Sequence, residues 1–204
     1  MKITSRLALT LALAGSAGAV CVGGASSASA TAVSAQSGGS VVTPFSCSAA
    51  TPLGTLSGSG TASFSGTTPA HVSVGATVVM SGFQATLTIP GSVLDELYQA
   101  GVHSLTAGVS AFDITSTDAT VPTENVVKKL VKVGHLTLQA SDNATLTIHI
   151  PRKAATVGSW VASQAGTMTF TPGSATVEFK AKAGSLSAQC TPSAPTPISS
   201  TTVS

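Results

Sequence analysis

Apolar side chains alternate with serine, threonine and other polar residues in short segments along most of this chain. In residues 83–89, for example, Phe83, Ala85, Leu87 and Ile89 stand at every second position. Successive side chains of a strand point to opposite faces, so a period of two residues indicates a strand with one buried face. Turn residues separate such segments at intervals of about ten residues. The pattern predicts an all-β fold, and specifically an immunoglobulin-like β-sandwich.

The alternating segments define the expected strands, which all lie within residues 41–190. These strands are residues 41–47, 55–64, 71–80, 83–89, 104–115, 119–121, 134–140, 144–150, 166–171, 175–181 and 185–190. The buried face of residues 71–80 is expected to carry Val72, Val74, Ala76, Val78 and Met80. Residues 124–133 contain valines suited to a strand and lysines suited to a helix, and we assign them to extended structure. Pro44 has no N–H group, which predicts that the first strand lies at a sheet edge.

The 41–190 sandwich could be one large unit or two related halves, residues 41–116 and 126–190. The sequence Ala-Thr-Leu-Thr-Ile at residues 85–89 recurs at residues 144–148, and a proline follows soon after each copy. Internal repetition of this kind favours related halves. No linker rich in proline or serine divides the middle of the chain, which favours one closed unit.

One short helix is expected, over residues 92–100. Ser92, with Asp95 three residues later, has the spacing of a capping box. Gly101 provides a stop signal. A helix of this length is not stable alone, so it must pack on the sheet. The side that would pack carries Leu94, Leu97 and Tyr98.

Residues 1–30 have the three parts of a secretory signal peptide. Lys2 and Arg6 provide a positive start, an apolar run follows, and Ala-Ser-Ala at positions 28–30 matches a cleavage site. Cleavage would leave residues 31–40 as a flexible leader. No later segment is long and apolar enough to span a bilayer, so we expect no membrane span after cleavage.

The C-terminal residues 191–204 differ in composition from the strands before them. They are rich in serine, threonine and proline and contain few apolar residues. Such a segment has little apolar surface to bury, and we expect it to form a disordered tail.

Two cysteines remain once the signal peptide is removed, because Cys21 leaves with it. Cys47 and Cys190 are then the only possible pair. Secreted proteins meet an oxidising environment, which favours a disulfide between these two residues. In the chain-entropy description, closing a loop of about 143 residues corresponds to roughly 5 kcal/mol.

Charge is scarce in this chain, which limits the partners that it can bind electrostatically. Charged residues make up 8% of the sequence, against about 25% in an average domain. Without Lys2 and Arg6, the seven remaining basic residues equal the seven acidic ones in number. A neutral chain of this kind offers no basic surface to the phosphates of DNA or RNA. We therefore expect no nucleic-acid partner.

Three segments together resemble a family of uncharacterised secreted actinobacterial proteins. They are the aromatic-x-Cys segment at residues 45–47, the Ile-Pro helix segment at residues 81–108, and the closing Cys-Thr-Pro at residues 190–192. The resemblance covers residues 41–192. It implies an exported domain of β-sandwich-like fold and unknown function, and it transfers no catalytic residues.

The sequence contains none of the motifs through which exported enzymes commonly act. Gly-x-Ser-x-Gly is absent, and so are His-Glu-x-x-His, the Walker loop and the calcium loop. The acidic residues Asp95 and Glu96 suit the first turn of the helix, and Asp113 and Asp118 flank a turn, which explains them better than paired catalytic carboxylates do. The histidines stand singly, without the spacing of metal ligands, at positions 71, 103, 135 and 149. We predict no catalytic residues, no metal site, no cofactor and no enzymatic activity.

Trp160 and Tyr98 are the candidate ligand-binding residues. Sugar-binding sandwiches usually stack several Trp or Tyr rings on sugars, and this chain has one of each. Trp160 follows a glycine and a serine in a predicted loop, although capping the end of the sandwich explains it as well. Tyr98 is also explained by packing of the helix on the sheet. The lysines at positions 128, 129 and 132 could contact an anionic cell-wall polymer, although a solvated face explains them too.

These observations favour a secreted, non-catalytic binding or structural module of the cell envelope or the extracellular medium. Its partner would be a cell-wall polymer or an envelope protein. Two alternatives stay open. The helix at residues 92–100 could close a pocket, which would make the chain a carrier of a small apolar ligand. A hydrolase site could also form from residues that meet only in the folded chain.

Overall fold

The computed structural model describes residues 40–204, apart from residues 52–53, 100, 128–130, 140–144 and 183. The predicted signal peptide and nearly all of the predicted leader lie outside the described residues. Within the described part the chain contains eleven strands and one helix. They are β1 (Val41–Thr51), β2 (Gly54–Thr67), β3 (His71–Val72), β4 (Thr77–Ile89), α1 (Gly91–Gln99), β5 (Ser104–Ser116), β6 (Thr123–Asn125), β7 (Val131–Thr137), β8 (Leu146–Val161), β9 (Gly166–Ala181), β10 (Gly184–Pro192) and β11 (Ser199–Val203). The prediction of an all-β, sandwich-like fold is confirmed.

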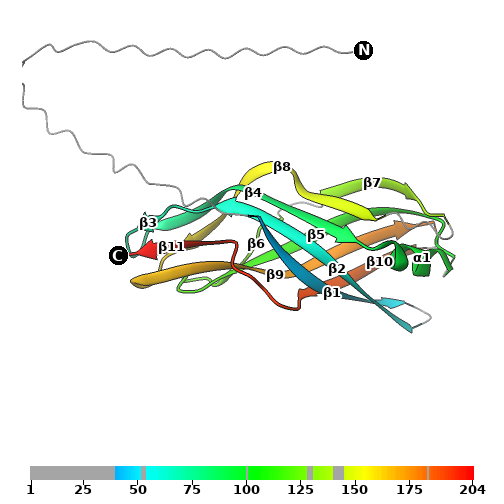
Figure 1. Cartoon of the computed structure of the whole chain (residues 1–204), viewed down its shortest axis with the longest axis horizontal. Helices are drawn as coiled ribbons and strands as arrows, with labels where there is room; N and C mark the ends of the chain where they lie inside the picture. The colour runs from blue at the N-terminus through cyan, green and yellow to red at the C-terminus, as the bar shows by residue number, and fades with distance from the viewer. Residues whose placement is uncertain (1–39, 52–53, 100, 128–130, 140–144, 183) are drawn as a thin grey trace, which may run out of the picture. The chain divides into compact units, whose positions relative to one another are not determined.

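The strands form one hydrogen-bonded sheet that folds over itself into two layers (Figure 1). Along the sheet the order is β3-β11-β9-β10-β1-β2-β4-β8, and β5 joins β9 and pairs in turn with β6 and β7. β9 is the branching strand, because β11 pairs with its residues 166–170, β10 with its residues 175–181, and β5 with residues 170–181. One layer contains β9 and the strands on its side of the path, namely β3, β5, β6, β7, β10 and β11. The other contains β1, β2, β4 and β8.

The two layers are joined along both sides. On one side β10 pairs with β1 in antiparallel register, so the sheet passes from one layer to the other without interruption. On the other side β8 approaches β6, where the Ser159 N–H donates to Glu124 Oε2 over 2.7 Å. Nearby, the Thr120 N–H donates to the Val161 carbonyl over 2.9 Å. These contacts cover strand edges that could otherwise pair with another chain, a hazard for a protein with few charged residues.

Aromatic rings from both layers form the centre of the core. Phe64 of β2 stacks on Phe112 of β5 with 5.4 Å between ring centroids, and Phe83 of β4 lies 6.1 Å from the same ring. Trp160 of β8 meets Phe170 of β9 edge-on at 4.9 Å. Each of the five side chains is 2% exposed or less. Stacked and edge-on rings therefore link one layer to the other across the sandwich.

The predicted buried face of residues 83–89 is confirmed, but that of residues 71–80 is only partly right. Val78 is 0% exposed, whereas Val74 is 50% exposed. The cause is a turn at Gly75, which has a φ of +82° and divides the predicted strand between β3 and β4. The alternation of apolar and polar residues continues through this turn, although the extended strand conformation does not.

The prediction that Pro44 places the first strand at a sheet edge is wrong. β1 lies between β2 and β10, with Pro44 opposite Thr61 of β2. The Pro44 carbonyl accepts a hydrogen bond from the Ser193 N–H over 2.9 Å. In a strand the N–H and carbonyl of one residue point to the same side. The missing N–H of Pro44 thus falls beyond the end of β10, where no ladder bond is lost.

The two copies of the Ala-Thr-Leu-Thr-Ile pattern lie side by side. In the β4–β8 ladder Leu87 faces Ile148 and Thr88 faces Thr147. Both strands bury the same kind of face against the same core, which accounts for their similar sequences. The possible halves 41–116 and 126–190 are not separate, because β4 and β5 of the first pair with β8 and β9 of the second. The sandwich is one large unit.

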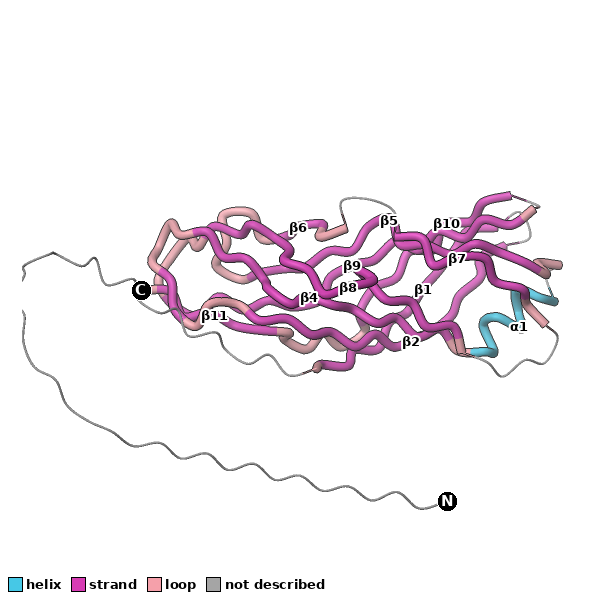
Figure 2. The backbone as a smooth tube through the Cα atoms, turned by 90° about the horizontal axis from the view of Figure 1, so that it is seen from above, coloured by secondary structure: helices cyan, strands magenta, loops and turns pink. Residues whose placement is uncertain are grey.

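The described part of α1 ends at Gln99, close to the stop that the sequence predicts at Gly101. The helix lies at the end of the sandwich opposite β3 and β11 (Figures 1 and 2). Gly101 has a φ of +83°, and its N–H donates to the Tyr98 carbonyl over 2.9 Å. The Val102 N–H donates to the Leu97 carbonyl over 3.0 Å. These two bonds are those of a Schellman motif, which requires a left-handed residue at the glycine position. The described residues include no helix long and apolar enough to cross a membrane.

The start of α1 differs from the predicted capping box. The Leu94 N–H donates to the Pro90 carbonyl over 3.4 Å. Pro90 therefore occupies the cap position and Ser92 lies inside the first turn. Asp95 Oδ1 is buried and has no hydrogen-bond partner among the described residues. The Ser-x-x-Asp spacing is present, but it begins two residues too late to cap the helix.

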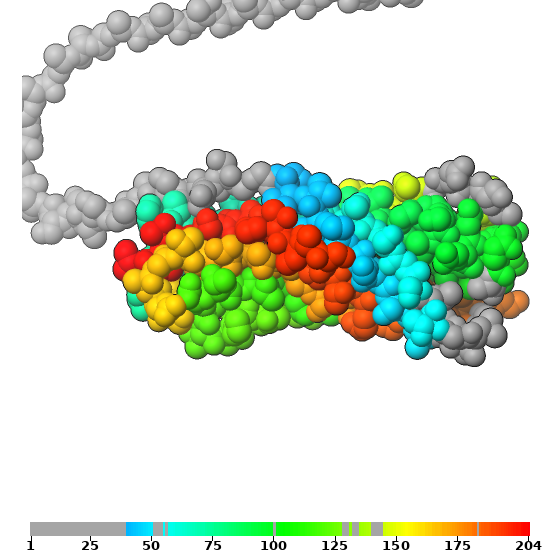
Figure 3. Space-filling view, turned by 60° about the horizontal axis from the view of Figure 1, so that its bottom comes forward, coloured from blue at the N-terminus to red at the C-terminus, as the bar shows by residue number. Residues whose placement is uncertain are grey.

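The prediction of a disordered tail at residues 191–204 is wrong. β10 extends to Pro192, and residues 199–203 form β11, antiparallel to β9 and parallel to β3. Figure 3 shows the red C-terminal residues on the surface beside the orange β9. Ile198 and Val203 are each 3% exposed. These two apolar residues pack into the core, which the serine, threonine and proline around them conceal in the composition.

Thr68, in the loop before β3, forms hydrogen bonds with β11. Its Oγ1 donates to the Ser200 carbonyl over 3.1 Å, accepts from Thr201 Oγ1 over 2.9 Å, and lies 2.7 Å from Ser199 Oγ. Thr68 is 1% exposed and Thr201 is 0% exposed. Such bonds are costly to lose because no water replaces them.

We expect Thr68→Val, which keeps the shape and removes these bonds, to lower the free energy of unfolding by about 1–3 kcal/mol. Urea unfolding followed by Trp160 fluorescence measures the change. Thr67→Val is the matched control, because Thr67 Oγ1 makes only an exposed 3.4 Å contact to the Ser81 carbonyl. Equal losses in the two variants would show that the Thr68 hydroxyl does not hold β11.

Candidate functional site

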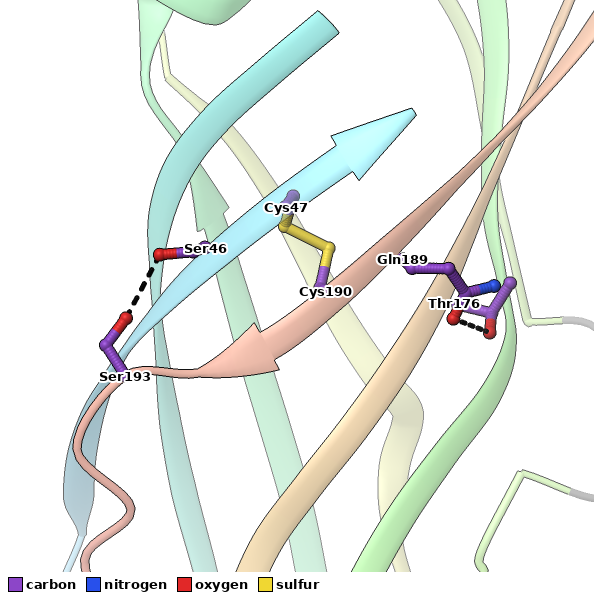
Figure 4. The surroundings of a disulfide bond; sticks show 6 residues. All are labelled: Ser46, Cys47, Thr176, Gln189, Cys190 and Ser193. Atoms are coloured by element: carbon purple, nitrogen blue, oxygen red, sulfur yellow. Dashed lines mark hydrogen bonds between the residues drawn. A yellow bond between two sulfur atoms is a disulfide. The ribbon is translucent and has the colours of Figure 1, made fainter. Parts of the chain in front are cut away.

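Cys47 and Cys190 form a disulfide, as predicted (Figure 4). They face each other in the β1–β10 ladder, with 4.0 Å between their Cα atoms. Hydroxyl contacts flank the bond, since Ser46 Oγ lies 3.1 Å from Ser193 Oγ. β1 and β10 belong to different layers of the sandwich, so the disulfide closes the side on which the two layers meet.

An apolar cavity of about 70 Å³ lies beneath α1. Its walls come from β1, β2, β4, β9 and β10, with α1 over them, and the disulfide forms part of the wall. Its apolar lining includes Ala49, Leu87, Ile89, Leu97, Val177 and Ala188. A lining of this kind buries an apolar group but offers few partners to a polar one.

Gly58 of β2 allows α1 to lie close to the sheet, and Gly60 allows the end of β4 to lie close to β2. A Cβ at Gly58 would stand 3.0 Å from Val93 Cγ2, and a Cβ at Gly60 would stand 2.8 Å from the Thr88 carbonyl oxygen. Side chains at these positions would force the helix and the neighbouring strand away. The alternation of serine and glycine at residues 57–60 is therefore the sequence signal of this site.

Glu96 is the charged residue among the described residues that line the cavity. It belongs to α1 and is exposed, so its carboxylate lies where the cavity meets solvent. The described lining residues provide no second titratable group for an acid–base pair with Glu96, since both cysteines are in the disulfide.

Trp160 lies in the core and not on the surface. It is in β8, is 1% exposed and packs on Phe170. A ring with both faces covered is not available to stack on a sugar, which contradicts the predicted ligand-binding role. Its Nε1 has no hydrogen-bond partner among the described residues. The alternative of a packing role for Trp160 agrees with this position.

Tyr98 is half-buried on α1 and stands apart from the cavity lining. Its ring meets that of His103 edge-on, with 4.5 Å between centroids. The structure thus gives Tyr98 a place in packing the end of the helix. It does not bring Tyr98 and Trp160 to one site, because they lie on α1 and in the core respectively.

The remaining polar candidates also lie apart from one another. Asp113 accepts a hydrogen bond from Ser174 Oγ over 2.6 Å, and Asp118 accepts one from Gln164. His149 Nδ1 lies 3.1 Å from Thr86 Oγ1 on the outer face. Among the described residues, no three histidine, cysteine or acidic side chains are grouped as a metal site would require. Lysines 128 and 129 lie outside the described residues.

Comparison with protein-family models and with curated proteins found no match. The resemblance to secreted actinobacterial proteins therefore stays a prediction. Among solved structures, the chain is similar to a crystal structure described as "Putative membrane anchored protein from Corynebacterium diphtheriae", an actinobacterial protein. The identity is 16%, the TM-score is 0.45, and the match covers 81% of this chain and 38% of that chain.

Proposed function

We propose that the chain is a non-catalytic binding module that holds a small apolar ligand, or the apolar end of a larger one, in the cavity beneath α1. The observation that supports this function is the apolar cavity between α1 and the side where the two layers join. The Cys47–Cys190 disulfide supports an oxidising compartment, such as the cell envelope or the extracellular medium.

The size of the cavity limits the ligand. Its volume of about 70 Å³ is roughly half that of a cavity known to hold benzene. Each buried methylene contributes about 0.8 kcal/mol. Two or three of them give about 2 kcal/mol, which corresponds to weak binding unless the rest of the ligand makes further contacts. The module therefore suits an abundant ligand or a group attached to a larger molecule.

Ala188→Leu is expected to weaken binding of 1-pentanol by roughly tenfold, because the added atoms occupy the space of about two methylenes. Ala188 lies in the cavity wall and is 6% exposed. An NMR chemical-shift titration measures the affinity, and Trp160 fluorescence checks the fold. Ala154→Leu is the matched control, since Ala154 is an exposed residue of β8. Equal affinities in the two variants would contradict this site.

A second candidate function is contact with a neutral polymer through the outer face of β1, β2, β4 and β8. Hydroxyl side chains form rows across these strands, because Thr88 faces Thr61 on one side and Thr147 on the other. β1, β2 and β4 contain no charged residue. Co-sedimentation with purified cell wall tests this function. Retention of the protein that Thr88→Lys abolishes would support it, and unchanged retention in that variant would exclude this face.

A further inference from the structure

A second, smaller cavity lies next to the first, in the core. Its volume is about 10 Å³, and its lining includes Phe64, Ala85 and Phe112. Leu87 and Cys190 line both cavities. Leu87 and Cys190 therefore stand between an outer cavity beneath α1 and an inner cavity at the phenylalanine cluster.

Both cavities lie between the layers of the sandwich, because the lining of each includes strands of both layers. Sheets packed face to face leave a space about 10 Å thick, which their own side chains fill. Enlarging this space sideways would require the layers to separate. Lengthening the space requires only a smaller side chain at Leu87. The other group between the two cavities, the disulfide, is fixed at both ends by β1 and β10.

We infer that the site takes a single unbranched alkyl chain with a neutral or cationic head group, and that Leu87 sets the length of chain that fits. This inference rests on the proposed binding function. The chain end enters from the α1 side and stops against Leu87, short of the inner cavity.

The head group follows from the charge at the entrance. The Glu96 carboxylate is exposed at the solvent side of the cavity. It attracts an ammonium head and repels a carboxylate head in the same position. Exposed charge pairs of this kind change affinity by about two- to fivefold.

A chain-length series tests the role of Leu87. Primary n-alcohols of increasing length should bind the full chain about fourfold more tightly per added methylene, and then reach a plateau. In Leu87→Ala, which joins the two cavities, the plateau should come about two or three carbons later, matching the atoms removed. Ile114→Ala is the matched control, because Ile114 is fully buried, lines neither cavity and loses the same number of carbon atoms, so the plateau should not move. Leu87→Val, expected to shift the plateau by about one carbon, serves if Leu87→Ala does not fold.

The outcomes separate this inference from the function on which it rests. Cyclohexanol binding as tightly as 1-hexanol, or a plateau that Leu87→Ala and Leu87→Val leave in place, would overturn the alkyl-chain inference while the cavity remained a binding site. Failure of every alcohol to bind would overturn both. For the head group, hexylamine should bind more tightly than hexanoate, and Glu96→Gln should remove the difference. Equal affinities of hexylamine and hexanoate for the unmodified chain would overturn the inference about the head group.

Discussion

Removing the disulfide by Cys47→Ala together with Cys190→Ala is expected to lower the free energy of unfolding by roughly 3–5 kcal/mol. The two cysteines are 143 residues apart in sequence. Closing a loop of this length removes much of the conformational entropy of the unfolded chain. Alanine suits the site because Cys190 is 2% exposed and both residues border an apolar cavity. A domain is stable by about 5–15 kcal/mol in all, so this loss is a large part of the total.

The measurement is guanidinium unfolding of the oxidised chain, the reduced chain and the double variant. The reduced chain should resemble the double variant, and adding a reductant to the double variant should change nothing. Unfolding midpoints that agree in all three would show that the β1–β10 ladder alone holds the two layers together on this side.

The sequence predicts elements well where one local rule decides the structure. Residues 83–89 alternate cleanly and bury the expected face because β4 lies centrally, with β2 on one side and β8 on the other. Gly101 ends the helix because its φ of +83° is a backbone conformation that glycine adopts readily. The cysteine pair was predictable because the third cysteine, Cys21, lies in the predicted signal peptide, which leaves Cys47 and Cys190 to pair.

Predictions fail where a distant contact overrides the local rule. The sequence indicates that a strand ends at Ile150, before a proline and two basic residues, yet β8 continues to Val161. Its register with β4 shifts between Ile150 and Ala155, which leaves Pro151 outside the regular ladder. An irregularity of this kind accommodates a proline without losing the strand. No pattern within residues 146–161 reveals it.

In the candidate site too, local features were predictable from the sequence and features that depend on distant contacts were not. A helix over a sheet and an apolar pocket beneath it were among the alternatives that the sequence left open. The wall of the cavity was not predictable, because Leu87, Val177 and Ala188 come together only through the order of the strands. The structure also removes Trp160 from the candidates, since its burial depends on Phe170 in the facing layer. These tertiary facts move the apolar-ligand function ahead of the surface-contact function that the sequence favoured.

The largest effect of a single methyl group is expected at Gly158. This residue has a φ of +78°, and a Cβ there would overlap the six-membered ring of Trp160. The ring cannot move aside, because Trp160 is 1% exposed and packed on Phe170. Gly158→Ala should therefore lower the free energy of unfolding by about 3–5 kcal/mol, the range of severe core substitutions.

Gly75→Ala separates the two causes of this loss. Gly75 has a φ of +82°, close to that of Gly158, but a Cβ there would meet nothing within 4 Å. It should therefore show only the backbone cost of a left-handed alanine, about 1–2 kcal/mol. Chemical unfolding measures both variants, and Trp160, as the single tryptophan of the chain, reports its own exposure by fluorescence. Gly158→Ala should shift the emission to longer wavelength and Gly75→Ala should not. If the two variants lose the same stability with unchanged emission, the Trp160 ring does not occupy the space above Gly158, and β8 does not pack against β9 through this ring.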